Sequence, residues 1–143
     1  MKLKMINGPN LNLLGHRDTS MYGPNTLEEL TNQLGAYAKQ MGIGLDSYQS
    51  NSEGDLIDQI HDSIGKYDGI ILNAGALTHY SYALHDAIEA YRLPVIEVHI
   101  TNIHKREGFR HRSVIARACR GQIVGLGIQG YFLAVDYFKK AKE

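Results

Sequence analysis

The feature of this sequence that most constrains its fold is the alternation of short apolar segments with longer amphipathic ones. Apolar runs typical of buried strands lie near residues 3–6, 69–74, 94–100 and 122–126, and a further strand is expected near residues 43–49. Segments with the periodicity of amphipathic helices lie near residues 26–41, 52–64, 79–91 and 130–140. This alternation, without a repeat or a linker, predicts an α/β fold in which helices cover both faces of a parallel sheet.

The number of strands and the chain length narrow the choice of topology. Five strands in 143 residues favour a flavodoxin-like three-layer sandwich with the strand order 2-1-3-4-5. We expect a single domain, residues 1–143. Local signals support the helices, because Thr26 with Glu29 has the form of a capping box. Leu56, Ile60 and Ile64 recur at helical spacing and are predicted to point inward.

The charge balance and the cysteine count exclude several classes of protein. With 15 basic and 15 acidic residues the formal net charge is zero, which argues against a general polyanion-binding protein. The single cysteine, Cys119, excludes an intrachain disulfide and suits a reducing compartment. No apolar signal region is present, and no apolar run approaches the roughly 20 residues of a membrane span. We therefore expect a cytoplasmic protein with no nucleic-acid partner and no membrane partner.

The connection from Asn7 to Gly23 is unusually long. It takes about 17 residues, whereas a strand and the following helix are usually joined by about 2 to 6. It contains Asn10, Arg17 and Tyr22 among glycines and leucines. Because long connections in compact domains are usually functional or disordered, and a linker rarely needs this mixture, we predict a functional loop.

Polar side chains occur where three of the predicted strands end. Asn7, Asn73 and His99 stand at the carboxyl ends of the first, third and fourth strands. Ligands of open α/β sheets bind outside these ends, so the three residues predict a site there. For Asn7 alone, a turn-forming role is an alternative.

Two pairs of residues suggest acid–base chemistry. Glu97 and His99 are two apart in a strand and share a face, and a buried carboxylate needs a partner such as an imidazole. The alternative is an exposed Glu and His at a strand end. His79 and Asp86 are seven apart, which places both on the same side of the third helix. His85 falls on another side and is expected to be a surface residue.

The basic residues cluster in one loop, and nothing in the sequence indicates a metal or a cofactor. His104-Lys-Arg106 and Arg110-His-Arg112 suit an anion clamp over the site, and the alternatives are a solvated loop or a nucleic-acid surface. The histidines lack the companion ligands of a closed zinc site, and no dinucleotide fingerprint or Walker loop is present. Cys119 is either a buried, inert thiol or one whose pKa neighbouring arginines lower.

Several motifs together resemble type II 3-dehydroquinate dehydratase over essentially the whole chain. They are Asn7-Gly-Pro-Asn-Leu-Asn-Leu-Leu-Gly15 with Arg17 and Tyr22-Gly23, Asn73-Ala-Gly-Ala-Leu-Thr-His79-Tyr-Ser, Glu97-Val-His99, Asn102-Ile-His, and Arg106-Glu-Gly-Phe-Arg-His. The resemblance implies dehydration of 3-dehydroquinate to 3-dehydroshikimate, in the shikimate pathway or in quinate breakdown. It further implies anti elimination through an enolate without metal, cofactor or Schiff base.

The resemblance also implies catalytic roles. Tyr22 matches the base. Half-ionising a tyrosine of pKa about 10 at pH 7 costs about 4 kcal/mol. Arg17 is therefore expected to stabilise the phenolate, and Arg106 is expected to add to the positive electrostatic field. Asn10 matches the residue that positions a water against the enolate oxygen. His99 matches the general acid, with Glu97 holding its ring.

The remaining implications concern substrate binding, the lid and assembly. The positions that match substrate-binding residues are Asn73, His79, Asp86, Ile100, Thr101, Arg106 and Arg110. The family's lid, carrying the base and the arginine, corresponds to residues 16–23, and its usual assembly is a homododecamer, a tetramer of trimers. Where the family commonly has Glu-Pro, this chain has Asp18-Thr19, which predicts a more mobile lid. Thr101 replaces the usual serine and keeps the hydroxyl.

Two alternatives to this function remain at the level of sequence. A non-enzymatic flavodoxin-like module would be an FMN carrier or a receiver, but Asn7-Gly-Pro-Asn10 is not a phosphate loop, and a receiver needs acidic residues where Asn7 and Asn73 stand. Another lyase or isomerase acting on a hydroxy acid or a sugar phosphate is the second alternative.

Overall fold

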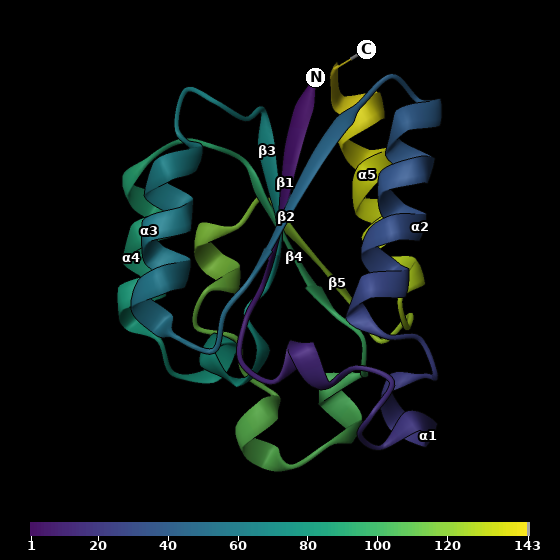
Figure 1. Ribbon diagram of the computed structural model, residues 1–143. Coiled ribbons are helices and arrows are strands. Elements are labelled where there is room, and N and C mark those ends of the chain that lie inside the picture. The colour runs from purple at the N-terminus through teal and green to yellow at the C-terminus, as the bar shows by residue number, and fades with distance from the viewer. Residues whose placement is uncertain (143) are drawn as a thin grey trace.

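The computed structural model, which describes residues 1–142, contains one five-stranded parallel sheet in the order β2-β1-β3-β4-β5 (Figure 1). The strands are β1 (Lys2–Asn7), β2 (Gly44–Gln49), β3 (Gly69–Asn73), β4 (Val95–His99) and β5 (Gly121–Val124). The α-helices are α1 (Thr19–Tyr22), α2 (Leu27–Gln40), α3 (Glu53–Ser63), α4 (Tyr82–Ala90) and α5 (Gln129–Lys142). The predicted flavodoxin-like topology is confirmed.

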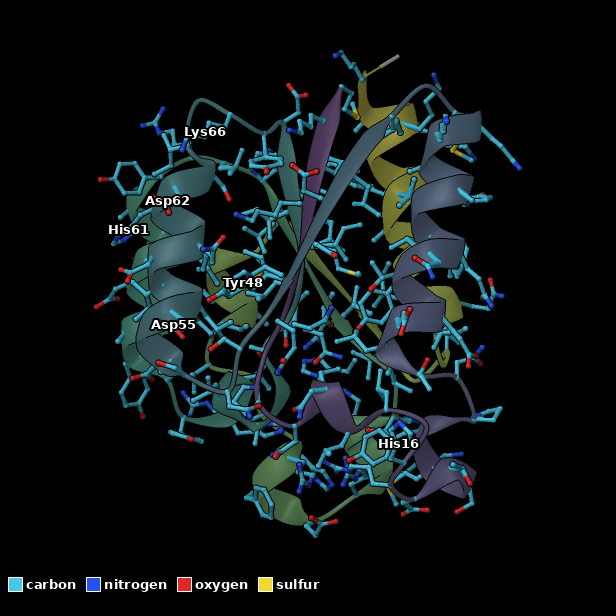
Figure 2. The ribbon with its side chains drawn as sticks, in the orientation of Figure 1. His16, Tyr48, Asp55, His61, Asp62 and Lys66 are labelled. Carbon is cyan, nitrogen blue, oxygen red and sulfur yellow. The ribbon has the colours of Figure 1, made fainter. Side chains whose placement is uncertain are left out.

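The sheet lies between two layers of helices, with α2 and α5 on one face and α3 and α4 on the other (Figure 1). Alternate residues of each central strand enter two separate apolar cores, because successive side chains of a strand point to opposite faces. Met5 and Ile71 pack with α2 and α5, whereas Ile6 and Ile70 pack with α3 and α4. The exposed side chains of α3, such as Asp55, lie on its outer surface (Figure 2).

Side-chain caps begin the long helices where the sequence indicates. The hydroxyl of Thr26 accepts a hydrogen bond from the backbone N–H of Glu29 at 3.1 Å, as the capping box predicts. Ser52 caps α3 in the same way through the N–H of Asp55 at 3.4 Å. Because these bonds satisfy donors that a helix leaves free, they define where each helix begins.

Two local predictions are wrong. Gly75–His79 is a 3-10 helix that ends before Ser81 caps α4, so His79 and Asp86 do not share one helix. Ile64, predicted to point inward, is 36% exposed because the chain leaves the helix there in an extended conformation.

The carboxyl ends of the strands gather the irregular segments at one end of the molecule, opposite the two chain termini (Figure 1). Asn7 of β1 lies directly beside Asn73 of β3 in the sheet register. Gly8 continues this contact by donating its N–H to the carbonyl of Asn73 at 2.7 Å. A Cβ at Gly8 would lie 2.6 Å from the carbonyl oxygen of Ala74, so only glycine lets the loop pack so closely. No helix within residues 1–142 is both long and apolar enough to cross a membrane.

Candidate active site

A cavity of about 100 Å³ opens at the carboxyl ends of β1, β3 and β4. It is lined by Pro9, Asn10, Leu11, Arg17, Tyr22, Asn73, Gly75, Ala76, His79, His99, Ile100, Thr101, Ile103, Arg106 and Arg110. The residues expected to act in catalysis or substrate binding are among them except Glu97 and Asp86, and Asn7, named from its strand end, does not line the cavity either. The cavity therefore lies at the edge of the sheet that the polar residues at the strand ends predicted.

Glu97 and His99 form a buried pair at the end of β4. The carboxylate of Glu97 is fully buried, His99 is 6% exposed, and the Nε2 of His99 lies 2.5 Å from the Oε2 of Glu97. Since an ionised carboxylate can only accept, Nε2 is the protonated ring nitrogen. The other nitrogen, Nδ1, is free of this contact, and the histidine lines the cavity. The exposed alternative is excluded.

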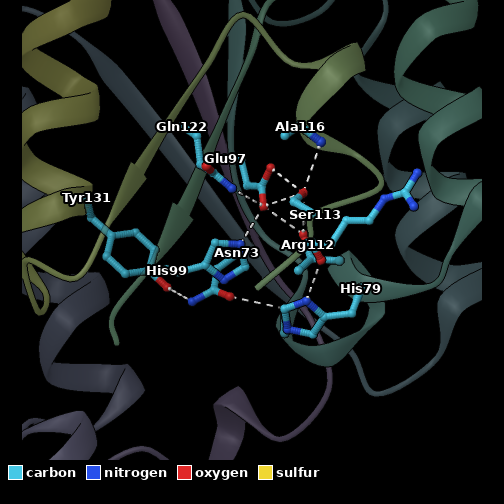
Figure 3. A network of polar contacts seen from close by, with 11 residues as sticks. Asn73, His79, Glu97, His99, Arg112, Ser113, Ala116, Gln122 and Tyr131 are labelled. Carbon is cyan, nitrogen blue, oxygen red and sulfur yellow. Dashed lines mark hydrogen bonds and ion pairs between the residues drawn. The ribbon is translucent and has the colours of Figure 1, made fainter. Parts of the chain in front are cut away.

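Three further side chains donate to Glu97 (Figure 3). The hydroxyl of Thr78 lies 2.7 Å from Oε2, that of Ser113 lies 2.9 Å from both carboxylate oxygens, and the amide of Gln122 lies 3.1 Å from Oε2. Burial acts to raise the pKa of Glu97, but the bonds and charge of His99 and the donors Thr78 and Gln122 outweigh it and hold that pKa below its ordinary value. Glu97 is therefore an ionised acceptor at neutral pH.

Asn73 is held by a tyrosine from the other end of the chain (Figure 3). Its amide donates to the hydroxyl of Tyr131 at 2.9 Å, and that hydroxyl donates to the Oδ1 of Asn7 at 2.7 Å. Its own Oδ1 accepts the N–H of Gly75 at 3.1 Å. Burial raises the pKa of Tyr131, so the hydroxyl stays protonated and joins the two asparagines.

His79 and His99 both line the cavity, and their rings are stacked with 6.4 Å between the centroids. The Nδ1 of His79 lies 2.8 Å from the carbonyl oxygen of Arg112 and so donates to it. Burial lowers the pKa of His79, and the nearby His99 and Arg110 add to the shift. The neutral ring has Nε2 as an acceptor for a ligand hydroxyl.

Tyr22 carries two guanidinium groups beside its ring. Arg17 donates to the phenol oxygen at 2.8 Å, and its Cζ lies 4.4 Å from the ring centroid. The Cζ of Arg106 lies 5.5 Å from the same centroid. Two positively charged groups therefore lie close to the Tyr22 side chain, one of them in contact with its phenol oxygen. The residues predicted as base and activator are thus in contact.

Asn10 projects into the cavity from a left-handed backbone conformation, with φ of 69°. Asparagine tolerates this region better than most residues. Its backbone N–H donates to the Oδ1 of Asn51 at 2.9 Å, which ties the loop to the segment after β2. An unusual conformation held by such a contact is typical of functional positions.

The basic loop contributes two arginines to the cavity. Arg106 donates from Nη1 to the hydroxyl of Thr101 at 3.2 Å, and its buried Nε has no hydrogen-bond partner within the described chain. Arg110 donates to Glu107 at 2.7 Å and stacks on the ring of Phe109. Two guanidinium groups with unused donors suit a carboxylate ligand, as the anion-clamp interpretation requires.

Asp86 lies outside the cavity. Its side chain is 78% exposed on α4 and contacts His85, which is partly buried rather than on the surface as predicted. With Glu89 these two residues form the one group of metal-type ligands found within residues 1–142, and none of the three lines the cavity. Cys119 is a poor nucleophile, since burial and the charge of Glu97 raise its pKa.

Sequence reasoning missed four residues that hydrogen-bond to site residues without lining the cavity themselves, namely Thr78, Ser113, Gln122 and Tyr131. A hydroxyl in a loop or on a helix has no spacing that links it to a distant carboxylate, and Gln122 in β5 lies beside Glu97 only through the register of two strands. One signal was available for Tyr131, because a tyrosine in the apolar stripe of a buried helix usually has a partner for its hydroxyl.

Comparison with known proteins gives a consistent result. Residues 1–139 match the family described as dehydroquinase class II. The chain is 58% identical over 134 residues to the 3-dehydroquinate dehydratase of Bacillus cytotoxicus, covering 94% of this chain and 92% of that protein. It is 50% identical over 143 residues to that of Thermotoga neapolitana, covering 100% of this chain and 97% of that protein. The crystal structure of type II dehydroquinase from Butyrivibrio crossotus superposes with a TM-score of 0.94 at 48% identity and 96% coverage of each chain.

Proposed function

Since this chain belongs to the dehydroquinase class II family, we propose that Tyr22 and His99 perform the two proton transfers of its reaction. The chain is a hydro-lyase that dehydrates 3-dehydroquinate to 3-dehydroshikimate in the shikimate pathway. The geometry of the cavity supports the roles proposed below for its residues.

Tyr22 is the proposed base. Its phenolate removes the proton from the carbon beside the ketone, and the electron pair moves onto the carbonyl oxygen to form an enolate. Arg17 contacts the phenol oxygen, and the guanidinium of Arg106 lies 5.5 Å from the ring centroid, so positive charge surrounds the proposed base. As the phenol re-forms, the two arginines remain beside the new negative charge on the substrate.

His99 is the proposed acid. When the enolate collapses, the carbon–oxygen bond to the leaving hydroxyl breaks, and the imidazolium protonates that oxygen so that it departs as water. The proton comes from the ring nitrogen that does not contact Glu97, while Glu97 keeps the ring oriented and its charge balanced. Base and acid line the same cavity, and the proposed reaction is an anti elimination.

Binding of substrate is divided among the other lining residues. Arg110, Arg106 and the backbone of Ile100 and Thr101 are the proposed partners of the carboxylate. Asn73 and the neutral ring of His79 are the proposed partners of the hydroxyls. Asn10 is proposed to hold a water against the enolate oxygen.

Asp86 is a separate case. Within one chain it lies outside the cavity, so it reaches substrate only where a second copy of the chain places it there. This is consistent with the homododecamer, a tetramer of trimers, that we propose for the cytoplasmic enzyme. Light scattering coupled to size-exclusion chromatography measures the number of chains directly, and a monomer would contradict the proposal.

The observation that carries the proposed mechanism is that the Arg17–Tyr22 pair and the Glu97–His99 pair line the same cavity. Incubation with 3-dehydroquinate should produce the ultraviolet absorption of a conjugated enone. Borohydride added during turnover should not trap a lysine adduct, because no step uses an amine. Folded protein that forms no enone would contradict the function, and a trapped adduct would contradict the mechanism.

A further inference from the structure

Ser113 occupies a position that the reaction scheme leaves without a role. It follows the basic loop, and its hydroxyl lies 2.9 Å from each oxygen of Glu97 (Figure 3). The N–H of Ala116 donates to the same hydroxyl at 3.0 Å. Because that N–H can only donate, the serine oxygen accepts it and the serine proton is directed to the carboxylate.

The residues on either side of Ser113 contact the segment that carries His79. The carbonyl of Arg112 accepts the Nδ1 proton of His79 at 2.8 Å, and the N–H of Val114 donates to the carbonyl of Thr78 at 2.8 Å. Three consecutive residues thus join β4 to the 3-10 helix Gly75–His79. The two histidines of the cavity are held through neighbouring residues of one short segment.

We propose that Ser113 is a positioning residue that sets both histidines of the site, His99 through Glu97 and His79 through the adjoining carbonyl of Arg112. This inference rests on the proposed roles of the two histidines in dehydration. Its distinctive consequence is that one hydroxyl controls the acid and a substrate-binding group together.

Thr78 provides the matched comparison. Its hydroxyl also donates to Glu97, at 2.7 Å, and lies 3.3 Å from the hydroxyl of Ser113, while its backbone carbonyl accepts the N–H of Val114. Thr78→Val removes the donor to Glu97 and the weak contact with the Ser113 hydroxyl, but it keeps the shape of the side chain and the backbone bond to the segment 112–114. Ser113→Ala removes a donor to Glu97 and also the acceptor that anchors the segment through Ala116.

The test is steady-state kinetics with 3-dehydroquinate on both variants. Ser113→Ala should lower kcat by about 10- to 100-fold and raise KM at least about threefold, because a lost bond to a charged group has an effect of this size. Thr78→Val should lower kcat by a similar factor and leave KM unchanged. Ser113→Thr, which keeps the hydroxyl, should recover most of the activity.

The pH profile separates positioning from a loss of folded protein. Removing a donor destabilises the carboxylate of Glu97, so the acid limb of the kcat profile should move to higher pH in Ser113→Ala and Thr78→Val and stay in Ser113→Thr. The other titratable groups facing Glu97 are His99, His79 and Cys119. A merely structural role would lower kcat equally at every pH.

Ser63→Ala is the control for loss of a buried serine hydroxyl. Ser63 is fully buried and donates to the carbonyl of Gln59 at 2.7 Å, within α3 and away from the cavity. It should keep wild-type kcat and KM. If wild-type enzyme is active and Ser113→Ala matches it in kcat and KM, the inference is overturned; a lowered kcat with unchanged KM overturns the link to His79. Inactive wild-type enzyme would instead overturn the proposed function.

Discussion

The two halves of the cavity are held in place in different ways. The acid half is built from the ends of β3 and β4, where Glu97 is fully buried and bonded to side chains from four separate segments. The half that carries the proposed base is the segment predicted as a lid, residues 16–23, where α1 has four residues and none is buried. Its central bond joins Arg17 to Tyr22, five residues apart.

This difference indicates which half is organised before substrate arrives. A buried network that joins distant parts of the chain can rearrange only if the core rearranges, so the acid is held in position by the fold itself. A short helix with no buried residue can open at little cost. We therefore expect changes in the acid half to affect both stability and rate, and changes in the lid to affect rate or binding alone.

The largest expected effect is that of Tyr22→Phe. It removes the proposed base while keeping the ring between the two arginines, so kcat should fall by about 10²- to 10⁴-fold, as expected for loss of a general base. The melting temperature should stay close to that of the wild type, because the side chain is only partly buried. Kinetics and thermal unfolding measure the two quantities, and a mild loss of kcat would remove Tyr22 as the base.

Glu97→Gln should affect both quantities. The amide presents donors to Thr78, Ser113 and Gln122, which are themselves donors, so kcat should fall by about 10- to 100-fold and the free energy of unfolding by about 1–3 kcal/mol.

The stability effect of Glu97→Gln should depend on pH. Because the pKa of Glu97 is lowered in the folded protein, its carboxylate stabilises the fold above its unfolded pKa, about 4.3, and this contribution is lost as pH falls through the lower folded value. The difference from wild type should therefore shrink below about pH 4. Denaturant titrations at several pH values test this, and a constant difference would contradict it.

Tyr131→Phe should affect mainly stability. It leaves the side-chain amide of Asn73 and the side-chain Oδ1 of Asn7 without their buried partner, which lowers the free energy of unfolding by about 1–3 kcal/mol. Tyr137→Phe, on the same helix but 37% exposed, is the matched control and should cost almost nothing. Equal destabilisation by the two variants would show that the buried bonds are not responsible.

The smallest expected effect is that of Thr19→Pro in the lid. Thr19 is the first residue of α1, a position that suits proline, and the substitution restricts the open lid. KM should fall by a few-fold, since less ordering entropy opposes closure, while the melting temperature changes little. Asp18 has a left-handed φ of 26°, which a following proline disfavours, and this strain opposes the decrease in KM. An increase in KM would show that this strain dominates.

Much of the site was predictable from the sequence, and the reason lies in the geometry of parallel sheets. Apolar runs identify the central strands, and parallel strands place all their carboxyl ends together, so Asn7, Asn73 and His99 had to meet at one edge. The shared face of Glu97 and His99 followed from the period of a strand. Where spacing was carried across an unseen helix break, as from His79 to Asp86, the prediction failed.

The sequence by itself determined the sheet, its order and the residues at its carboxyl edge, because these follow from periodicities within continuous segments. Only the tertiary structure decided which neutral donors surround Glu97 and which hydroxyl joins Asn7 to Asn73. Those contacts span up to 124 residues of sequence and depend on how loops and α5 pack against the strands. A hydrogen bond needs two atoms within about 3 Å, and only the packed fold brings such distant groups that close.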